Sequence, residues 1–169
     1  PLVNFTSSVI SGCQPLRVEF TENSPVDGQS YYWNFGDSEF FNYSIAKNPV
    51  YIYQNPGTYE VSLTVTSAAN CLTESKMLED IIVHPKPVSV FEAEPQTANI
   101  ADPTIEFNNT SIDAQQWFWS FGDGDSVMIQ YPLPHTYPAI PGEYLVALET
   151  ESDMGCRDTS FQIIRIKEI

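Results

Sequence analysis

Apolar and polar residues alternate along several short segments of the chain, and this alternation predicts β-strands. In residues 59–66 every odd position is apolar and every even position is polar, and residues 16–21 and 144–149 follow a similar pattern. Because successive side chains of a strand point to opposite faces, each segment offers one face to a core and one to water. Turn-forming Pro, Gly and Asn residues separate the segments, and no stretch shows sustained helical periodicity. The pattern therefore indicates an all-β protein.

Two six-residue stretches, 32–37 and 118–123, combine alternating aromatic residues with a final Gly-Asp. The alternation places two aromatic rings of each stretch on one strand face, where we expect them to form a core. Gly-Asp favours turn geometry, so each strand is predicted to end at this dipeptide. The residues concerned are Trp33, Phe35, Gly36 and Asp37 in the first stretch, and Trp119, Phe121, Gly122 and Asp123 in the second.

These stretches belong to an internal repeat that runs through the whole chain. Trp33 and Trp119 are 86 residues apart (119 − 33), and Cys71 and Cys156 are 85 residues apart (156 − 71). Each half also carries a Tyr and then a Gly-x-Tyr after its aromatic stretch. These residues are Tyr53, Gly57 and Tyr59 in the first half, and Tyr137, Gly142 and Tyr144 in the second.

A repeat of this length predicts two small domains, which we place at residues 1–84 and 85–169. Short strands separated by turns are typical of β-sandwiches, so each domain is expected to be one. Residues 84–87 read His-Pro-Lys-Pro, and two prolines make this junction stiff because proline fixes φ.

The charge of the chain is strongly negative. It has 22 acidic and 7 basic residues, which give a formal net charge of −15. Such a surface repels phosphate backbones, so we expect no nucleic-acid partner. No segment has the uninterrupted apolar length of a membrane helix, so we expect no membrane insertion. The abrupt start at Pro1 suggests that the sequence is a segment of a longer protein.

The motifs Trp-x-Phe-Gly-Asp, x-His-x-Tyr and Gly-x-Tyr-x-Val together resemble the PKD (polycystic kidney disease) domain, in the same order in both halves. The resemblance implies two tandem immunoglobulin-like β-sandwiches of an extracellular or cell-surface protein. The variant with Gly-Cys before the second strand and Cys after the long strand resembles tandem modules of large Bacteroidetes surface proteins. Such proteins imply type IX secretion, gliding motility and adhesion.

The first half departs from the PKD pattern at two positions. Ser38 follows Gly36-Asp37 where the pattern has Gly, and Tyr51 stands where the pattern has His. An obligatory ligand or catalytic role would tolerate such changes badly. The motif is therefore interpreted as architectural.

The resemblance also implies a disulfide. In the resembling family the pair that corresponds to Cys13 and Cys71 is bonded, and small extracellular domains use such bonds for stability. Cys156 corresponds to Cys71, and Ile100 is taken as the position that corresponds to Cys13. Cys156 is therefore predicted to be a buried free thiol.

The turn carboxylates Asp37 and Asp123 have two interpretations. An Asp directly after a strand commonly accepts backbone N–H bonds and fixes the turn. The alternative is calcium, for which Asp123 and Asp125 are the candidates, and some PKD-like modules of collagenases bind this ion. Calcium takes six to eight oxygen ligands, and the spacing here is not that of an EF-hand loop. We expect no metal or cofactor, with calcium as the alternative.

Tyr32 and Phe118 are predicted on the strand face opposite the core, where they could stack on sugar rings or pack against a neighbouring module.

The histidines of the sequence do not indicate a catalytic site. His84 lies in the junction and His135 has Tyr51 as its counterpart, so the two halves share no His. Neither can be placed beside a Ser and an Asp, which general-base chemistry on a Ser nucleophile needs.

The sequence thus favours a non-catalytic spacer segment of a secreted or surface-anchored adhesin. Its expected partners are neighbouring domains of the same chain, and surface proteins or polysaccharide are further candidates. The alternative is an accessory carbohydrate-binding module of a secreted polysaccharide-degrading enzyme.

Overall fold

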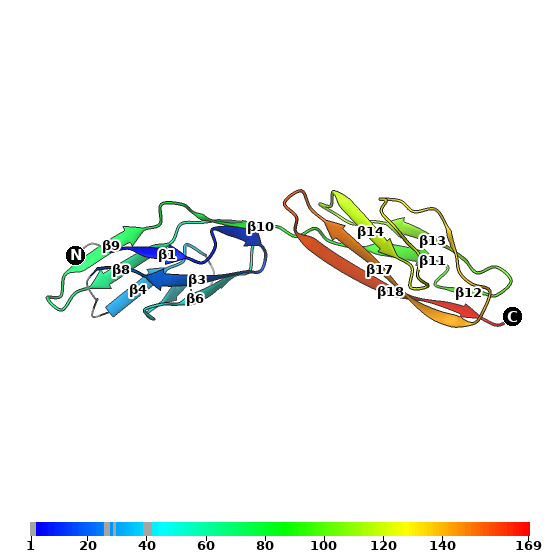
Figure 1. Ribbon diagram of the computed structural model, residues 1–169, viewed down its shortest axis with the longest axis horizontal. Coiled ribbons are helices and arrows are strands. Elements are labelled where there is room, and N and C mark those ends of the chain that lie inside the picture. Colours follow the sequence, from blue (N-terminus) through cyan, green and yellow to red (C-terminus); the bar gives the residue numbers. More distant parts are fainter. Residues whose placement is uncertain (1–2, 26–27, 29, 39–41) are drawn as a thin grey trace. The chain divides into compact units, whose positions relative to one another are not determined.

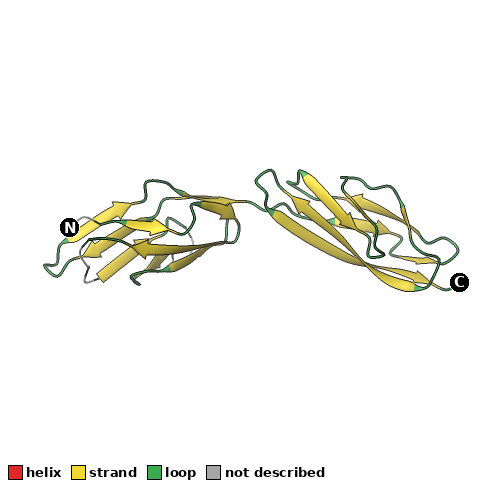
Figure 2. Ribbon diagram, in the orientation of Figure 1, coloured by secondary structure: helices red, strands yellow, loops and turns green. Residues whose placement is uncertain are grey.

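Strands and loops account for all the residues that the computed structural model describes, which are 3–25, 28, 30–38 and 42–169. The chain divides into two units, residues 1–85 and 86–169 (Figures 1 and 2). Each unit is a β-sandwich, so the chain is all-β with two tandem sandwiches. Among the described residues there is no helix of the length and hydropathy that a membrane span requires.

Unit 1 contains ten strands and unit 2 contains eight in the described residues. Those of unit 1 are β1 (Phe5–Ser7), β2 (Ser11–Cys13), β3 (Leu16–Glu22), β4 (Ser30–Asn34), β5 (Tyr43–Ser44), β6 (Val50–Tyr53), β7 (Gly57–Tyr59), β8 (Ser62–Thr66), β9 (Leu72–Lys76) and β10 (Ile81–His84). Those of unit 2 are β11 (Phe91–Glu94), β12 (Thr97–Asn99), β13 (Thr104–Asn109), β14 (Gln116–Ser120), β15 (Ser126–Val127), β16 (His135–Thr136), β17 (Gly142–Glu151) and β18 (Arg157–Lys167).

Unit 2 shows the sandwich plan most simply. One sheet has the order β11-β13-β16, and the other has the order β12-β18-β17-β14-β15. All neighbouring strands are antiparallel except β12 and β18, which run parallel. Alternate residues of the strands point inward, so both sheets bury one face in a common core.

Unit 1 follows the same plan, but its larger sheet is broken into β2-β10-β7 and β5-β4-β8-β9. The sequence predicted one strand over residues 59–66, and the structure interrupts it between Tyr59 and Ser62. The last strand of the unit, β10, begins at Ile81, after a bend at Leu78 and Glu79. Strand β9 was not predicted, since its Leu72 is exposed and the segment lacks apolar alternation.

The same aromatic cluster forms the centre of both cores. Trp33 is fully buried and meets Phe5 edge to face, with ring centroids 5.0 Å apart. Trp119 is fully buried in unit 2 and meets Phe91 in the same way at 5.1 Å. Edge-to-face contacts suit the charge distribution of aromatic rings. The repeated sequence motif thus builds the same interior twice.

Candidate functional site

Both halves share the geometry of the turn that follows the Trp strand. Gly36 has φ +73° and Gly122 has φ +85°, a left-handed conformation that residues with a Cβ rarely adopt. A Cβ on Gly122 would lie 2.6 Å from the carbonyl oxygen of Leu145, and one on Gly36 would overlap that of Glu60. Glycine is therefore required at both positions by conformation and by space.

The Asp after each Gly accepts a hydrogen bond from the strand that crosses beneath it. In unit 1 the Tyr51 hydroxyl donates to Asp37 Oδ2 at 3.1 Å. In unit 2 His135 Nε2 lies 2.7 Å from Asp123 Oδ2, and the backbone N–H of Asp125 donates to Asp123 Oδ1. Tyr51 and His135 also stack on Phe35 and Phe121. A phenol and an imidazole therefore make the same contact.

The pKa of the Asp123 carboxyl is lowered from its ordinary value. Burial alone would raise this pKa, and the hydrogen bonds from His135 and from the N–H of Asp125 outweigh that effect. A carboxyl whose pKa is lower in the folded state stabilises the fold above its unfolded pKa. That stability is lost as the pH falls through the folded pKa.

We expect Asp123→Asn to lower the Tm of unit 2 at pH 7 by roughly 4–8 °C, the shift that about 1 kcal/mol produces in a domain of this size. The difference from wild type should shrink as the pH falls through the lowered pKa of the folded Asp123 carboxyl. Thermal melts followed by circular dichroism from pH 7 to pH 2 measure this. His135→Tyr, which installs the pair of unit 1, is the matched control and should melt near wild type. An unchanged difference across the whole pH range would contradict the assignment.

A tyrosine hydroxyl in each unit forms a hydrogen bond between this turn and the opposite sheet. Tyr53 donates to the carbonyl of Phe35 at 3.0 Å, and Tyr137 donates to that of Phe121 at 3.1 Å. Burial raises the pKa of both phenols, so both stay protonated and remain donors. The bonds explain why a Tyr recurs at this position.

The remaining residues of the predicted motif border this region. Tyr59 and Tyr144 pack on Tyr53 and Tyr137, with ring centroids 4.4 Å and 4.6 Å apart. Gly57 and Gly142 begin strands β7 and β17, two residues before these tyrosines. The predicted residues thus lie together, and they form hydrogen-bonded and packed structure around the turn.

The carboxylates of unit 2 include one group with metal-ligating atoms close together. Atoms of Asp123, Asp125 and His135 lie within 4.8 Å of one another. Three ligands are fewer than the six to eight that calcium takes, and His135 supplies nitrogen where calcium prefers oxygen. In unit 1 the Asp37–Tyr51 pair makes the same contact with a phenol. The hydrogen bonds therefore account for the arrangement, and calcium remains the alternative.

EDTA should leave the Tm of the chain unchanged if hydrogen bonds alone hold the Asp123 turn. A calcium site would add binding free energy to the folded state, so its removal would lower the Tm. Melts with EDTA and with 5 mM calcium chloride, read beside the Asp123→Asn variant, make the comparison. A Tm that rises with calcium in wild type and not in the variant would establish the metal.

The predicted cysteine pairing is wrong. Cys13 and Cys156 are the disulfide-bonded residues, and Cys71 is a free, exposed thiol. Cys156 is therefore not the free thiol, and Cys71 is not the partner of Cys13. The expected number of free thiols, one, is unchanged, but its position moves to Cys71.

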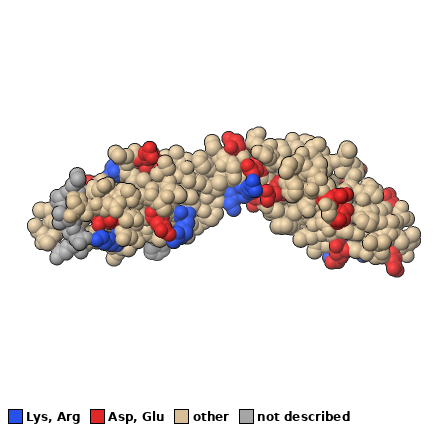
Figure 3. Space-filling model, in the orientation of Figure 1, with Lys and Arg blue, Asp and Glu red and all other residues tan. Residues whose placement is uncertain are grey.

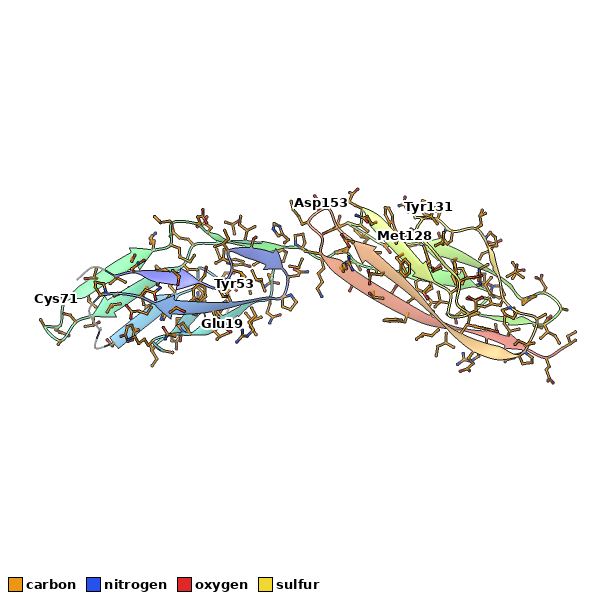
Figure 4. The ribbon with its side chains drawn as sticks, viewed as in Figure 1. Glu19, Tyr53, Cys71, Met128, Tyr131 and Asp153 are labelled. Atoms are coloured by element: carbon orange, nitrogen blue, oxygen red, sulfur yellow. The ribbon has the colours of Figure 1, made fainter. Side chains whose placement is uncertain are left out.

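The topology of unit 1 explains why Cys13 and Cys71 do not pair. Cys13 ends β2, beside His84 at the end of β10. Cys71 lies in the turn between β8 and β9, at the opposite end of the unit (Figure 4). A disulfide bridges Cα atoms no more than about 7 Å apart, which excludes this pair. The strand register also corrects the repeat: Cys13 pairs with His84 as Asn99 pairs with Lys167, so Asn99, and not Ile100, is the counterpart of Cys13.

Cys71 and Cys156 nevertheless occupy the same turn. The N–H of each donates to a Ser hydroxyl four residues earlier, Ser67 and Ser152, at 3.2 Å. The carbonyl of each accepts from the backbone N–H of that same Ser. The difference in redox state between the two cysteines is therefore not a difference in local backbone structure.

Iodoacetamide applied to the native, non-reduced chain should label Cys71 alone. Peptide mapping without reduction should then find the Cys13 and Cys156 peptides in disulfide-linked form only. Cys71→Ser, which leaves the disulfide untouched, should abolish labelling and serves as the control. A labelled Cys156 would restore the original pairing.

The two aromatic candidates for ligand stacking differ in their surroundings. Tyr32 is about half exposed and stacks on Tyr43, with ring centroids 5.8 Å apart. Phe118 is 38% exposed and lines a groove in unit 2 together with Trp117. The sequence analysis missed Trp117 as a site residue, although a third Trp directly before the repeated motif was a visible signal.

A catalytic arrangement is not formed around either histidine. His135 is bound to Asp123, the turn carboxylate, and His84 ends strand β10. Among the described residues His135 is the histidine that contacts a carboxylate. Its place is taken by Tyr51 in unit 1, so the contact serves the turn.

Two β-sandwiches that repeat one aromatic core and one Gly-Asp turn define a tandem immunoglobulin-like module pair. A family model described as "PKD domain" matches residues 1–81 and again 84–167. The chain therefore belongs to the PKD domain family and carries two copies of the domain. PKD domains are generally non-catalytic and typically extracellular, and the disulfide fits that setting.

Several solved structures resemble single halves of the chain. The PKD1 domain of the Vibrio cholerae metalloprotease PrtV is 28% identical over 48% of this chain and 98% of that one, with a TM-score of 0.42. The PKD1 domain of Vibrio anguillarum Epp is 22% identical over 50% and 96%, with a TM-score of 0.43. A structure titled for carbohydrate-binding modules of the β-sandwich superfamily is 26% identical over 49% and 35%, with a TM-score of 0.45.

Proposed function

We propose that this PKD pair is a non-catalytic mechanical spacer in a secreted or cell-surface adhesin. The parallel pairing of the second and last strands in each unit is the observation that carries the proposal. In unit 2, β12 runs parallel to β18, with Thr97 opposite Arg165 and Asn99 opposite Lys167. In unit 1, β2 runs parallel to β10 in the same way.

The parallel pairs β2–β10 and β12–β18 resist extension because of the direction in which the load acts on them. Pulling the two ends of a unit apart slides one strand along the other, so the hydrogen bonds between them are loaded together. Antiparallel strands pulled at one end would instead open one bond at a time. A unit of this topology is therefore suited to transmit tension without unfolding.

Single-molecule stretching of the chain by its termini tests the spacer function. In the presence of reductant we expect each unit to unfold at a resolvable force peak, because shear loads the hydrogen bonds of its parallel strand pair together. Units that extend without a resolvable force peak after reduction would refute the mechanical role.

The parent protein, on this proposal, is an adhesin of the Bacteroidetes type, delivered to the surface by type IX secretion and connected with gliding motility. The motif style of the two halves supports this setting. The partners are then neighbouring domains of the same chain and surface proteins. Flanking domains in the full reading frame decide between an adhesin and a secreted hydrolase.

Polysaccharide binding is the second candidate function, and the exposed ring of Phe118 beside a groove favours it. Pull-down with insoluble polysaccharides distinguishes it from a pure spacer. Retention that Tyr32→Ala or Phe118→Ala removes would favour an accessory binding module, and no retention would favour the spacer alone.

A further inference from the structure

A groove of about 590 Å³ opens along the edge of strand β14 in unit 2. Strand β15 pairs only with Trp119 and Ser120, so in the described structure Gln116 to Phe118 have no strand partner on that side. The chain after β15, from Met128 to Gln130, lines the groove and does not pair with β14 as a strand. Figure 4 labels Met128.

Trp117 gives the groove an unusual chemical feature. Its indole Nε1 is buried, and no hydrogen-bond partner is present in the part of the chain that the structure describes. Buried donors are nearly always paired, because an unpaired one costs free energy. The Nε1 of Trp119, two residues later, is paired with the carbonyl of Ile129 at 3.0 Å. The unpaired N–H of Trp117 therefore points to a missing acceptor.

Unit 1 provides an internal comparison at the same place. Trp33 Nε1 donates to Ala46 as Trp119 Nε1 donates to Ile129, so Lys47 corresponds to Gln130. Lys47 lies 6.0 Å over the ring of Tyr31, the counterpart of Trp117, and the Tyr31 hydroxyl donates to the carbonyl of Gly28. The position is thus covered and paired in unit 1, whereas unit 2 has a shorter, neutral amide and an open groove.

Polar groups of the lining are matched to hydroxyl groups. Gln115, Gln116 and Gln130 each carry an amide that both donates and accepts. The carboxylates of Glu149 and Glu151 accept hydrogen bonds. Both form ion pairs with Arg157, with N···O distances of 3.3 Å to Glu149 and 2.6 Å to Glu151. Hydroxyls need donors and acceptors side by side, which this set supplies.

The apolar part of the groove and the charge of the chain narrow the ligand further. Trp117 and Phe118 offer aromatic faces, whose negative charge attracts polarised C–H groups. The net charge of −15 and the exposed acidic residues of unit 2 oppose an anionic ligand (Figure 3). A ring with C–H groups on one face and hydroxyls at its rim meets all these conditions.

We infer that this groove binds a neutral hexose unit of a glycan, with the indole of Trp117 turning so that its buried Nε1 donates to a ring hydroxyl. The site deepens the polysaccharide-binding function and rests on it, and it is independent of the spacer role. A mixed groove of this size, with a few convergent polar groups, is typical of small-ligand sites.

The test uses the 169-residue chain and three neutral probes: cellohexaose, chitohexaose and maltohexaose, with the matching insoluble polymers as a second arm. Binding is followed by amide chemical shifts and by retention. Trp117→Phe keeps an aromatic face and removes the N–H, so it should weaken binding about tenfold, the loss expected for one hydrogen bond. Gln130→Lys should abolish binding, because the new Lys would lie over the Trp117 ring as Lys47 lies over Tyr31 in unit 1. Tyr31→Phe in unit 1 is the matched control and should bind as wild type.

The outcomes distinguish the β14 groove from polysaccharide binding in general. If Trp117→Phe and Gln130→Lys are both retained by the polymers as well as wild type, the groove is not the binding site, although the chain binds polysaccharide. No retention of any probe would overturn both and leave the spacer. Dimerisation of the chain through the β14 edge, removed by Gln130→Lys in light scattering, would replace the glycan by a second copy.

Discussion

Trp119→Ala is expected to lower the free energy of unfolding of unit 2 by about 3–5 kcal/mol, the range for truncating a buried aromatic side chain. The indole is fully buried, its Nε1–H donates to the carbonyl of Ile129, and its ring meets those of Phe91 and Phe107. Truncation therefore removes core contacts, leaves a cavity and removes the hydrogen-bond donor of the Ile129 carbonyl. Urea unfolding followed by circular dichroism measures the change.

Trp33→Ala provides the matched experiment in unit 1. The two units have separate cores, so each variant should shift one unfolding transition and leave the other in place. A loss below about 1 kcal/mol in either variant would mean that the Trp is not core structure. It would also reopen the question of an indole that serves a ligand.

Gly122→Ala should destabilise unit 2 by about 3–4 kcal/mol, because it combines backbone strain with an overlap. The residue has φ +85°, and its new Cβ would lie 2.6 Å from the carbonyl oxygen of Leu145 in strand β17. Leu145 belongs to a ladder with β18, so the strand cannot move away without breaking hydrogen bonds. Thermal and urea unfolding give the loss.

Gly124→Ala separates these two causes. Gly124 also has a positive φ, at +108°, but nothing lies within 4 Å of its ideal Cβ. Its substitution should therefore cost only the backbone strain, roughly 1–2 kcal/mol. Equal losses for Gly122→Ala and Gly124→Ala would mean that close approach to β17 does not matter.

The repeated turn shows what the PKD motif requires at each position. A Gly is needed for conformation, and an Asp is needed to accept hydrogen bonds. The residue beneath the Asp needs only to donate and to stack, which Tyr51 and His135 both do. The departure at Tyr51 is therefore compatible with the same structure, and the motif describes a packed turn.

Strand signals in the sequence varied with burial. Segments that bury one face, such as β3 and β17, show apolar alternation and were predicted. Strand β9 lies at the edge of a sheet with an exposed Leu72, so no hydrophobic pattern marked it. Its position follows only from pairing with β8, which is a contact between segments.

The sequence by itself determined the strand class, the two repeats and the residues of each core, because alternation and spacing are local properties that burial imposes on neighbouring positions. Only the tertiary structure decided the disulfide and the groove. Cys13 and Cys71 share a unit, but its strands carry them to opposite ends. The side chains of the groove come from β14, β17, β18 and the segment after β15, and their convergence depends on strand order and register. Spacing along a chain does not measure such distances.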